Sequence, residues 1–413
     1  MRMVRIRQHF PRPREADVAL AVRREMERLD LAARLKPGSR VAITAGSRGI
    51  ANISLILAEA VAYFKRIGAK PFLVAAMGSH GGGTVAGQRQ VLEHLGITEA
   101  AIGAEIQIGD KAVAIGVAPT GQTVYCDAYA AQADALFIIN RVKPHTSFRG
   151  ELESGLFKMM VVGLGKRPGA ESFHRLGWQQ MADSLVVMGR FFLEKMPVVG
   201  GLAIIENGYE ETAGLYGLRP AEMEAREKEL LQEARRLLPR LPAQEIDLLV
   251  VDEIGKDISG TGMDSNVIGR RRIDGEPDFY PPRIKRIVVL GLSPGTGRNG
   301  YGIGLADFTT ERVVAALDRE PMYVNAIASG GLSKAMIPIT LPNDREAIAA
   351  ALRSLGGQAE RVMRIRNTLH LDVLEVSPAL ARELPADGRY EFLGEREWEF
   401  DAAGRLVPLE LPE

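Results

Sequence analysis

Short apolar runs alternate along the chain with segments in which apolar residues recur every three or four positions. This alternation is typical of an α/β protein with mainly parallel sheets. The apolar runs predict strands at residues 41–44, 71–76, 133–139, 246–251, 287–292 and 337–339, with short strands over 390–411. The helical spacing predicts helices over residues 52–67, 88–95, 170–195 and 220–238. We therefore expect two α/β domains with Rossmann-like sheets and an active-site cleft between them.

The chain of 413 residues is too long for one ordinary core. Pro239 and Pro242 interrupt it directly after a strongly helical segment. This predicts a catalytic, cofactor-binding domain over residues 1–243 and a second α/β domain over 244–388. The tail, 389–413, could cross back to the first domain.

Composition excludes several classes of protein. Lys plus Arg and Asp plus Glu each number 52, so no bulk charge attracts nucleic acid or an anionic membrane. One cysteine, Cys126, excludes an internal disulfide and a cysteine-cluster metal site. No apolar run reaches about 18 residues, and the basic N-terminus lacks the apolar part of a signal peptide. We expect a cytoplasmic protein without a membrane span.

Three loops that follow predicted strands of the first domain carry polar side chains: Ser47 with Arg48, Ser79 with His80, and His145. The carboxyl ends of parallel strands share one edge of the sheet, where ligands bind. Two histidines could therefore face each other there. For each histidine taken alone, a solvated or structurally paired ring is the open alternative, and a surface arginine is the alternative for Arg48.

Lys158 lies among glycine and apolar residues, where an amine is costly unless it is paired or used chemically. A structural lysine whose stem reaches water is the alternative. His174 follows near a predicted helix start. We expect the other histidines, at positions 9, 94 and 370, to be structural.

Four segments occur in the order Gly78-Ser79-His80, Pro144-His145, Ser154-Gly155-Leu156-Phe157-Lys158 and Phe173-His174. Together they resemble the signature set of the nickel-pincer lactate racemase family. The step from Lys158 to His174, 174 − 158 = 16 residues, also agrees with that family. The resemblance includes Ser47-Arg48 and continues more loosely through residues 262–266.

The resemblance implies an isomerase, a 2-hydroxy acid racemase or epimerase that uses reversible hydride transfer from C2. Lys158 would hold a pyridinium-3-thioamide-5-thiocarboxylate mononucleotide through a thioamide, and His174 would be the protein's Ni(II) ligand. His80 and His145 would be the acid/base pair, one for each enantiomer. The remaining positions would be Ser47, Gly155 and Asp264 at the cofactor, with Arg48 and Arg272 at the substrate. Expected partners are the small 2-hydroxy acid and the enzymes that synthesise and insert the cofactor.

Some positions depart from the family pattern. Ala45-Gly46 stands where lactate racemases carry an Asp-His pair, and Ile268 and Arg272 stand at a tyrosine and a lysine. These changes argue against lactate itself. The hypothesis is a larger or more polar 2-hydroxy acid, such as an aldonate.

Two other functions compete with this interpretation. Residues 295–300 fit GxGxxG, which would indicate an NAD-dependent 2-hydroxyacid dehydrogenase. However, no helix is predicted promptly after Gly300, and the acidic residues come before the next predicted strand, residues 322–327. We therefore expect a loop that needs tight turns. A non-catalytic sensor of a metabolite or nucleotide is the other alternative, in which the arginines at 270–272 would meet an anionic partner.

Overall fold

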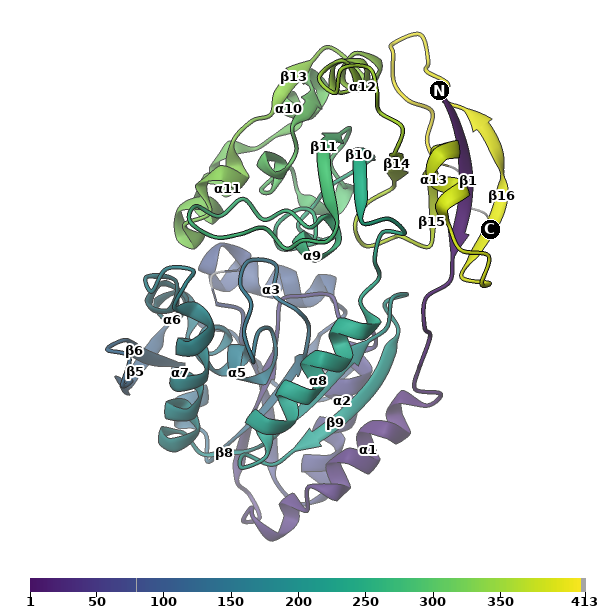
Figure 1. The fold of residues 1–413 in the computed structure, drawn as a ribbon. Coiled ribbons are helices and arrows are strands. Elements are labelled where there is room, and N and C mark those ends of the chain that lie inside the picture. The colour runs from purple at the N-terminus through teal and green to yellow at the C-terminus, as the bar shows by residue number, and fades with distance from the viewer. Residues whose placement is uncertain (79, 410–413) are drawn as a thin grey trace. The chain divides into compact units, whose positions relative to one another are not determined.

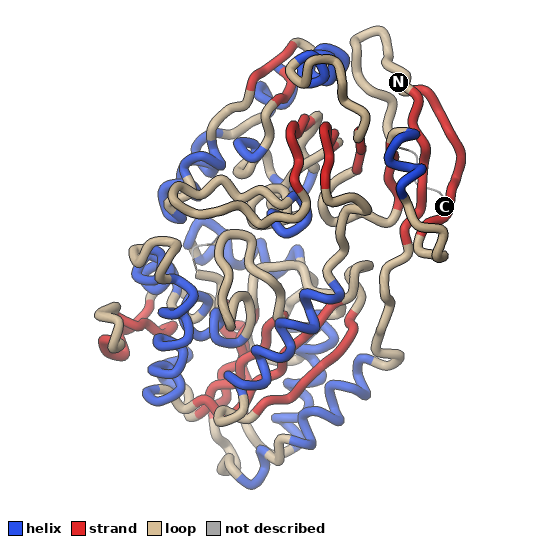
Figure 2. The backbone as a smooth tube through the Cα atoms, viewed as in Figure 1, coloured by secondary structure: helices blue, strands red, loops and turns tan. Residues whose placement is uncertain are grey.

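The computed structural model describes residues 1–78 and 80–409, and it divides into two compact units (Figures 1 and 2). The N-unit is Arg12–Leu238. The C-unit is Met1–Pro11 together with the described part of Pro239–Glu413. Each unit is built on its own sheet, as expected of a two-unit α/β protein.

Over its described residues, the N-unit has a six-stranded sheet in the order β4-β3-β2-β7-β8-β9. The first five strands are parallel, and β9 runs antiparallel to β8. The strands are β2 (Arg40–Ala45), β3 (Lys70–Ala75), β4 (Ile106–Gln107), β7 (Ala135–Arg141), β8 (Val198–Glu206) and β9 (Thr212–Leu218). The predicted strands at 41–44, 71–76 and 133–139 are thereby confirmed. A separate hairpin pairs β5 (Ala112–Val117) with β6 (Thr123–Asp127).

Successive residues of a strand point to opposite faces of the sheet. Both faces of this sheet carry buried apolar side chains, and helices cover both. Ile43 and Phe137 face one core, whereas Ala42 and Ile138 face the other. The first core is covered by α1 (Val18–Arg28), α2 (Ile53–Arg66), α3 (Val85–His94) and α4 (Glu99–Ile102). The second is covered by α5 (Leu156–Lys158), α6 (Lys166–His174), α7 (Met181–Lys195) and α8 (Met223–Leu237).

The single helix expected over residues 170–195 is two helices in the structure. Gly177 lies between α6 and α7 with a φ of 72°, a left-handed conformation that glycine adopts without steric cost. The second glycine of the segment, Gly189, lies within α7, at a place where a Cβ would lie 2.2 Å from a ring atom of Phe157. Gly189 allows α7 to pack closely against Phe157 and does not interrupt the helix.

The C-unit has an eight-stranded sheet over its described residues, in the order β13-β12-β11-β10-β14-β15-β1-β16. Neighbours from β13 to β14 are parallel, and those from β14 to β16 are antiparallel. The strands are β1 (Arg2–Gln8), β10 (Glu245–Val251), β11 (Arg283–Val289), β12 (Phe308–Thr310), β13 (Ile339–Leu341), β14 (Val362–Ile365), β15 (Val373–Val376) and β16 (Tyr390–Glu397). Its helices are α9 (Ser265–Ile268), α10 (Glu311–Ala316), α11 (Arg319–Ser329), α12 (Asp344–Arg353) and α13 (Pro378–Glu383).

The N-terminal strand belongs to the C-unit, whereas the predicted division placed residues 1–11 in the first domain. In Figure 1 the purple β1 lies between the yellow β15 and β16. The tail expected to cross back therefore pairs with residues 2–8, inside the C-unit sheet. The change of unit after Leu238 falls close to the predicted boundary at residue 243.

The strand expected at residues 322–327 is wrong, because this segment lies within α11. Asp318 caps the helix by accepting a hydrogen bond from the Glu320 amide at 3.2 Å. Met322 and Ala326 are buried at i,i+4 spacing. Over the described chain, none of the helices combines the length and apolar character needed to cross a membrane.

Candidate functional site

Three neighbouring parallel strands of the N-unit end at the same edge of its sheet. The loops after β2, β3 and β7 carry Arg48, His80 and His145. This is the edge at which ligands bind in open α/β sheets. Ser79 lies outside the described residues.

His80 is held by two side chains from the loop after β2. Ser47 Oγ is hydrogen-bonded to Nδ1 of His80, and Nη2 of Arg48 lies 3.4 Å from Nε2. Because a guanidinium can only donate, Nε2 acts as the acceptor in this contact. A neutral His80 ring then carries its proton on Nδ1 and donates it to Ser47, which leaves Nε2 able to take up a proton.

The contacts of His145 favour the opposite tautomer of the neutral ring. The backbone N–H of Ser147 donates to Nδ1 of His145 at 3.0 Å, so the proton of a neutral ring lies on Nε2. The ring is stacked on Phe148, with centroids 4.3 Å apart and planes 27° apart. His145 is therefore arranged to give a proton at Nε2, whereas His80 is arranged to accept one.

A buried carboxylate, Glu153, fixes the loop of His145. It accepts hydrogen bonds from the backbone N–H groups of His145, at 2.5 Å, and Gly150, at 3.2 Å. It also forms ion pairs with Arg235, at 2.5 Å, and Arg149, at 3.6 Å. The charge of Glu153 is thereby balanced inside the protein.

Lys158 ends α5, and a π-helical turn, Met159–Gly163, follows it. Burial lowers the pKa of the Lys158 amine to about 7, and the charge of Arg48 lowers it further against an opposing effect of Glu153. The Nζ atom lies 6.0 Å from the ring centroid of Phe148. A large fraction of this amine is unprotonated near neutral pH, which makes it a nucleophile.

His174 ends α6 and contacts two other aromatic rings at their edges. Its ring centroid lies 5.7 Å from that of Phe173 and 6.3 Å from that of Trp178. Burial lowers the pKa of His174 to about 4, with a smaller contribution from the charge of Lys158. Its Nδ1 atom is buried and has no hydrogen-bond partner among the described residues. An unprotonated imidazole with an unpartnered nitrogen is suited to a metal ion.

Phe148 connects these groups. Its ring contacts His145 by stacking and Lys158 through the amine, and it lies edge-on to Phe173 at 6.3 Å. Phe148 is 2% exposed, so its position is fixed by the core. The histidine of the β7 loop, the lysine of α5 and the helix of His174 thus share one packed ring.

A buried ion pair anchors the first turn of α6. Lys166 Nζ lies 3.1 Å from Oδ2 of Asp127 and donates to Oε1 of Gln88 at 2.9 Å. It also donates to the carbonyl of Ala75, the last residue of β3. Lys166 therefore ties the helix of His174 to the strand that precedes the His80 loop.

The N-unit brings together six of the predicted site residues: Ser47, Arg48, His80, His145, Lys158 and His174. Gly155 is the residue directly before α5.

Two predicted residues, Asp264 and Arg272, belong to the C-unit. Asp264 caps α9 through the amide of Asn266. Arg272 donates to the carbonyls of Gly304 and Ala306 and pairs with Asp307 at 2.5 Å.

The side chains that hold the site in place were not predicted from the sequence: Phe148, Glu153, Glu227 and the pair of Lys166 and Asp127. Glu227 accepts hydrogen bonds from the backbone N–H groups of Leu156 and Phe157 at the start of α5. Glu227 could have been found from the sequence, because it occupies a position of its helix at which the helical spacing predicts an apolar residue. The roles of Phe148 and Glu153 depend on contacts between loops that no spacing in the sequence encodes.

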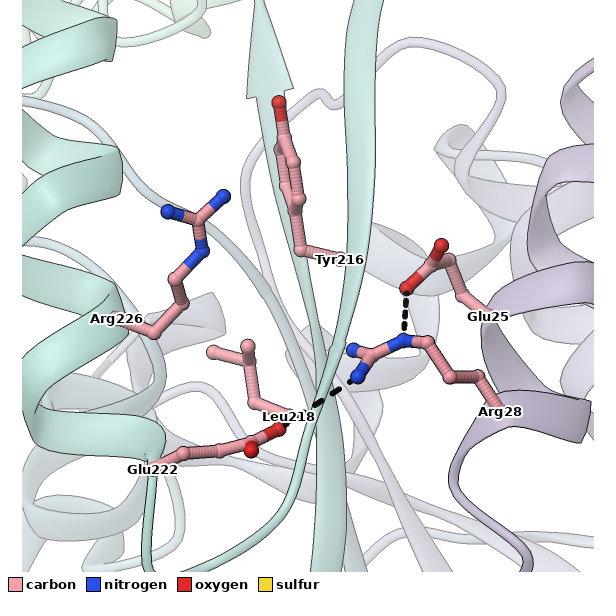
Figure 3. Close-up of a pocket in the computed structure, with 6 residues that line it drawn as sticks. All are labelled: Glu25, Arg28, Tyr216, Leu218, Glu222 and Arg226. Atoms are coloured by element: carbon pink, nitrogen blue, oxygen red, sulfur yellow. Dashed lines mark hydrogen bonds and ion pairs between the residues drawn. The ribbon is translucent and has the colours of Figure 1, made fainter.

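A surface pocket of the N-unit lies elsewhere (Figure 3). Its charged residues are paired: Arg28 lies 3.1 Å from Glu25 and 3.9 Å from Glu222, and Arg226 forms an ion pair with Glu229. Leu218 of this pocket pairs with Gly201, near the amino end of β8. The pocket is therefore at the opposite edge of the sheet from the histidine loops, and its balanced charges select no ion.

Comparisons with known proteins bear on the fold. No protein-family model matches the chain, and no curated protein matches it. Among solved structures, this two-unit α/β chain is similar to the lactate racemase apoprotein from Thermoanaerobacterium thermosaccharolyticum. The TM-score is 0.53 at 12% sequence identity, and the match covers 89% of this chain and 98% of that one. The chain thus has a lactate-racemase-like fold.

Proposed function

We propose that the chain is an isomerase, a racemase or epimerase of 2-hydroxy acids that carries a nickel-pincer nucleotide. The observation that supports this most is a lysine of pKa about 7 whose charge acts on a histidine with a buried Nδ1 that has no partner in the described part of the chain. An unprotonated amine suits covalent attachment, and an open imidazole nitrogen suits nickel. Lys158 would hold the nucleotide, a pyridinium-3-thioamide-5-thiocarboxylate mononucleotide, and His174 would bind Ni(II). The bound cofactor supplies a reversible acceptor for the C2 hydride.

The chain's own residues would handle the proton. His80, with its Nε2 lone pair, would take the hydroxyl proton of one enantiomer, and His145 would act on the hydroxyl of the other. Arg48 would bind the substrate's carboxylate. Burial and the neighbouring Arg141 lower the pKa of Arg48 to about 10, so it stays protonated at neutral pH. Ser47 and Gly155 complete the proposed contacts of the N-unit to the cofactor. In the C-unit, the resemblance assigns Asp264 to the cofactor and Arg272 to the substrate.

The cofactor can be tested directly by producing the protein together with the enzymes that synthesise and insert it, its proposed partners. We expect a cofactor-sized mass increase with about one nickel per chain, and the loss of both in Lys158→Ala. Lys195→Ala changes a partly exposed lysine of α7 and is the matched control. Wild-type protein that gains neither mass nor nickel, while a known member of the family loads normally, would overturn the proposal.

The proposed substrate is an aldonate or a similar polar 2-hydroxy acid. Ala45-Gly46 replaces a bulkier, charged pair of the family, and Ile268 has no polar group where the family has a tyrosine. Racemisation of lactate and epimerisation of an aldonate would be compared on the loaded protein. A higher kcat/KM for lactate would refute this choice of substrate.

The loop at residues 295–300 gives the dehydrogenase alternative no support. Its first residues form a 3₁₀ turn, Pro294–Thr296, and the residues after Gly300 form another, Ile303–Leu305. Within the described chain, no α-helix opens at this loop to receive a pyrophosphate. The helix that comes later, α10, follows β12 instead.

A further inference from the structure

Glu227 is a buried acid on a helix whose other charged residues are all partly or fully exposed. It is 1% exposed and shares the inward face of α8 with Met223, Leu230 and Leu231. This spacing of i, i+3 and i+4 is that of core positions, so an acid there needs a specific partner.

The partner is the turn that carries Lys158. Oε2 of Glu227 accepts hydrogen bonds from the backbone N–H groups of Leu156, at 2.9 Å, and Phe157, at 3.2 Å. These are the two residues directly before Lys158, and the first amides of a helix have no partner within the helix itself. Glu227 therefore supplies their acceptor from another element.

The same turn is fixed by close contacts on its other sides. Asn140, near the end of β7, donates to the carbonyl of Gly155 at 2.8 Å. A Cβ on Gly155 would lie 2.0 Å from Oε1 of Glu227, so only glycine permits the approach. Phe157 packs against Gly189 of α7. The backbone from Gly155 to Lys158 is therefore held by β7, α7 and α8 together.

We infer that Glu227 is a positioning residue that fixes the backbone of Lys158 and keeps its amine in a desolvated place. The inference rests on the proposed function for the use made of that amine.

Burial raises the pKa of Glu227 to about 8, so the side chain is largely a neutral acid at neutral pH. A neutral acceptor can hold the turn without placing a negative charge beside the amine. The charges acting on Lys158 are those of Arg48 and Glu153.

The test measures the reactivity of Lys158 in cofactor-free full-length protein. Trinitrobenzenesulfonate labelling at Lys158 would be followed by peptide mass mapping across pH. Glu227→Gln keeps a neutral acceptor and should leave the pH midpoint within half a unit of wild type. Glu227→Leu removes the acceptor, admits water to the turn, and should raise the midpoint by at least one unit. Glu233→Leu, which alters the contact of another α8 acid with Tyr216, should leave the midpoint unchanged.

A wild-type midpoint in Glu227→Leu, or an equal shift in Glu227→Gln, would overturn the inference. If Glu227→Leu does not fold, Glu227→Asp decides, because it keeps the charge type but withdraws the oxygens by one methylene. The midpoint should then rise in Glu227→Asp, and an unchanged one overturns the inference. The proposed function fails separately, if wild type takes up no cofactor although the Glu227 variants behave as expected.

Discussion

The two histidines of the site are chemically unequal although they occupy equivalent loops. His80 is oriented by a serine hydroxyl and a guanidinium, whereas His145 is oriented by a backbone amide. In the neutral forms their protons lie on different ring nitrogens. Each direction of the proposed reaction therefore starts from a different ring, and the two enantiomers need not be converted by symmetrical steps.

Replacing either histidine should abolish most of the activity. His80→Asn and His145→Asn should each lower kcat of the loaded enzyme by about 10²–10⁴-fold, since each removes a proton-transfer group. Ser47→Ala should cost less, on the order of 10-fold, because it removes only an orienting contact. His94→Asn, on α3, is the control. Unchanged turnover by His80→Asn would contradict the assignment.

Glu227 should make the stability of the protein depend on pH. Its pKa is raised from 4.5 to about 8 in the folded state, so the folded protein binds one more proton than the unfolded chain between these values. The free energy of unfolding should fall with rising pH across that window, by about 1.4 kcal/mol per unit for this group. Glu227→Gln lacks this pH-dependent contribution to stability, because an amide side chain does not titrate.

Urea unfolding of wild type and Glu227→Gln at pH 5, 6.5 and 8 measures the difference. The variant should gain stability relative to wild type as the pH increases. Parallel pH profiles of the two proteins would show that Glu227 titrates normally in the fold.

Sequence reasoning locates residues whose chemistry is unusual for their place, but not residues that act through packing. His80, His145 and Lys158 were candidates because loops after strands share one edge and because an amine among apolar residues is costly. The resemblance to the nickel-pincer lactate racemase family then gave them their expected roles. Phe148 is one apolar residue among many in the sequence. Only the folded chain shows that its ring contacts His145 and Lys158.

At the scale of elements, α6 depends on the buried pair of Lys166 and Asp127. Lys166→Met should lower the free energy of unfolding by about 3–5 kcal/mol, because Asp127 would remain buried without its cation. Arg190→Met breaks an ion pair of 2.6 Å to Glu224 whose arginine is 61% exposed, and should cost far less stability, because solvent screens an exposed pair. Equal losses in chemical denaturation would show that Lys166 is no anchor.

Hydrophobic spacing predicted the central strands and the long helices, such as β2, β10 and α8, but not several other elements, such as β1 and β8. Two departures from the prediction have local causes. The break between α6 and α7 depends on the left-handed backbone of Gly177, while Gly189 in the same segment remains helical. Residues 322–327 contain β-branched and apolar side chains and were expected to be a strand, yet the Asp318 cap and the buried pair of Met322 and Ala326 make them helical. Short windows cannot separate a buried strand from a helix by periodicity alone.

At the scale of the molecule, the two units differ in how the chain builds them. The N-unit is one continuous segment, whereas the C-unit needs residues 1–11 as well as the segment after Leu238. Met3 and Ile6 of β1 are fully buried between β15 and β16. No single fragment of the second half of the chain therefore contains the whole C-unit sheet.

We expect isolated fragments of the two units to differ in whether they fold. A fragment of residues 12–238 should fold alone and unfold cooperatively in urea. A fragment of residues 239–413 should not unfold cooperatively, because β15 and β16 lack the strand between them. A synthetic peptide of residues 1–11 should restore the cooperative transition of this fragment. A fragment 239–413 whose unfolding midpoint is the same with and without the peptide would contradict the role of β1.

The placement of β1 also sets an order of events during synthesis. Its residues leave the ribosome before those of the N-unit, whereas their partners at 373–376 and 390–397 leave after the N-unit. At about 5–20 residues per second, the first strand waits on the order of 20–70 s for them. During that time the whole N-unit emerges behind it. A strand that is made before the N-unit thus takes its place only after the N-unit has been made, and the eight-stranded sheet is completed only once residues 390–397 have emerged.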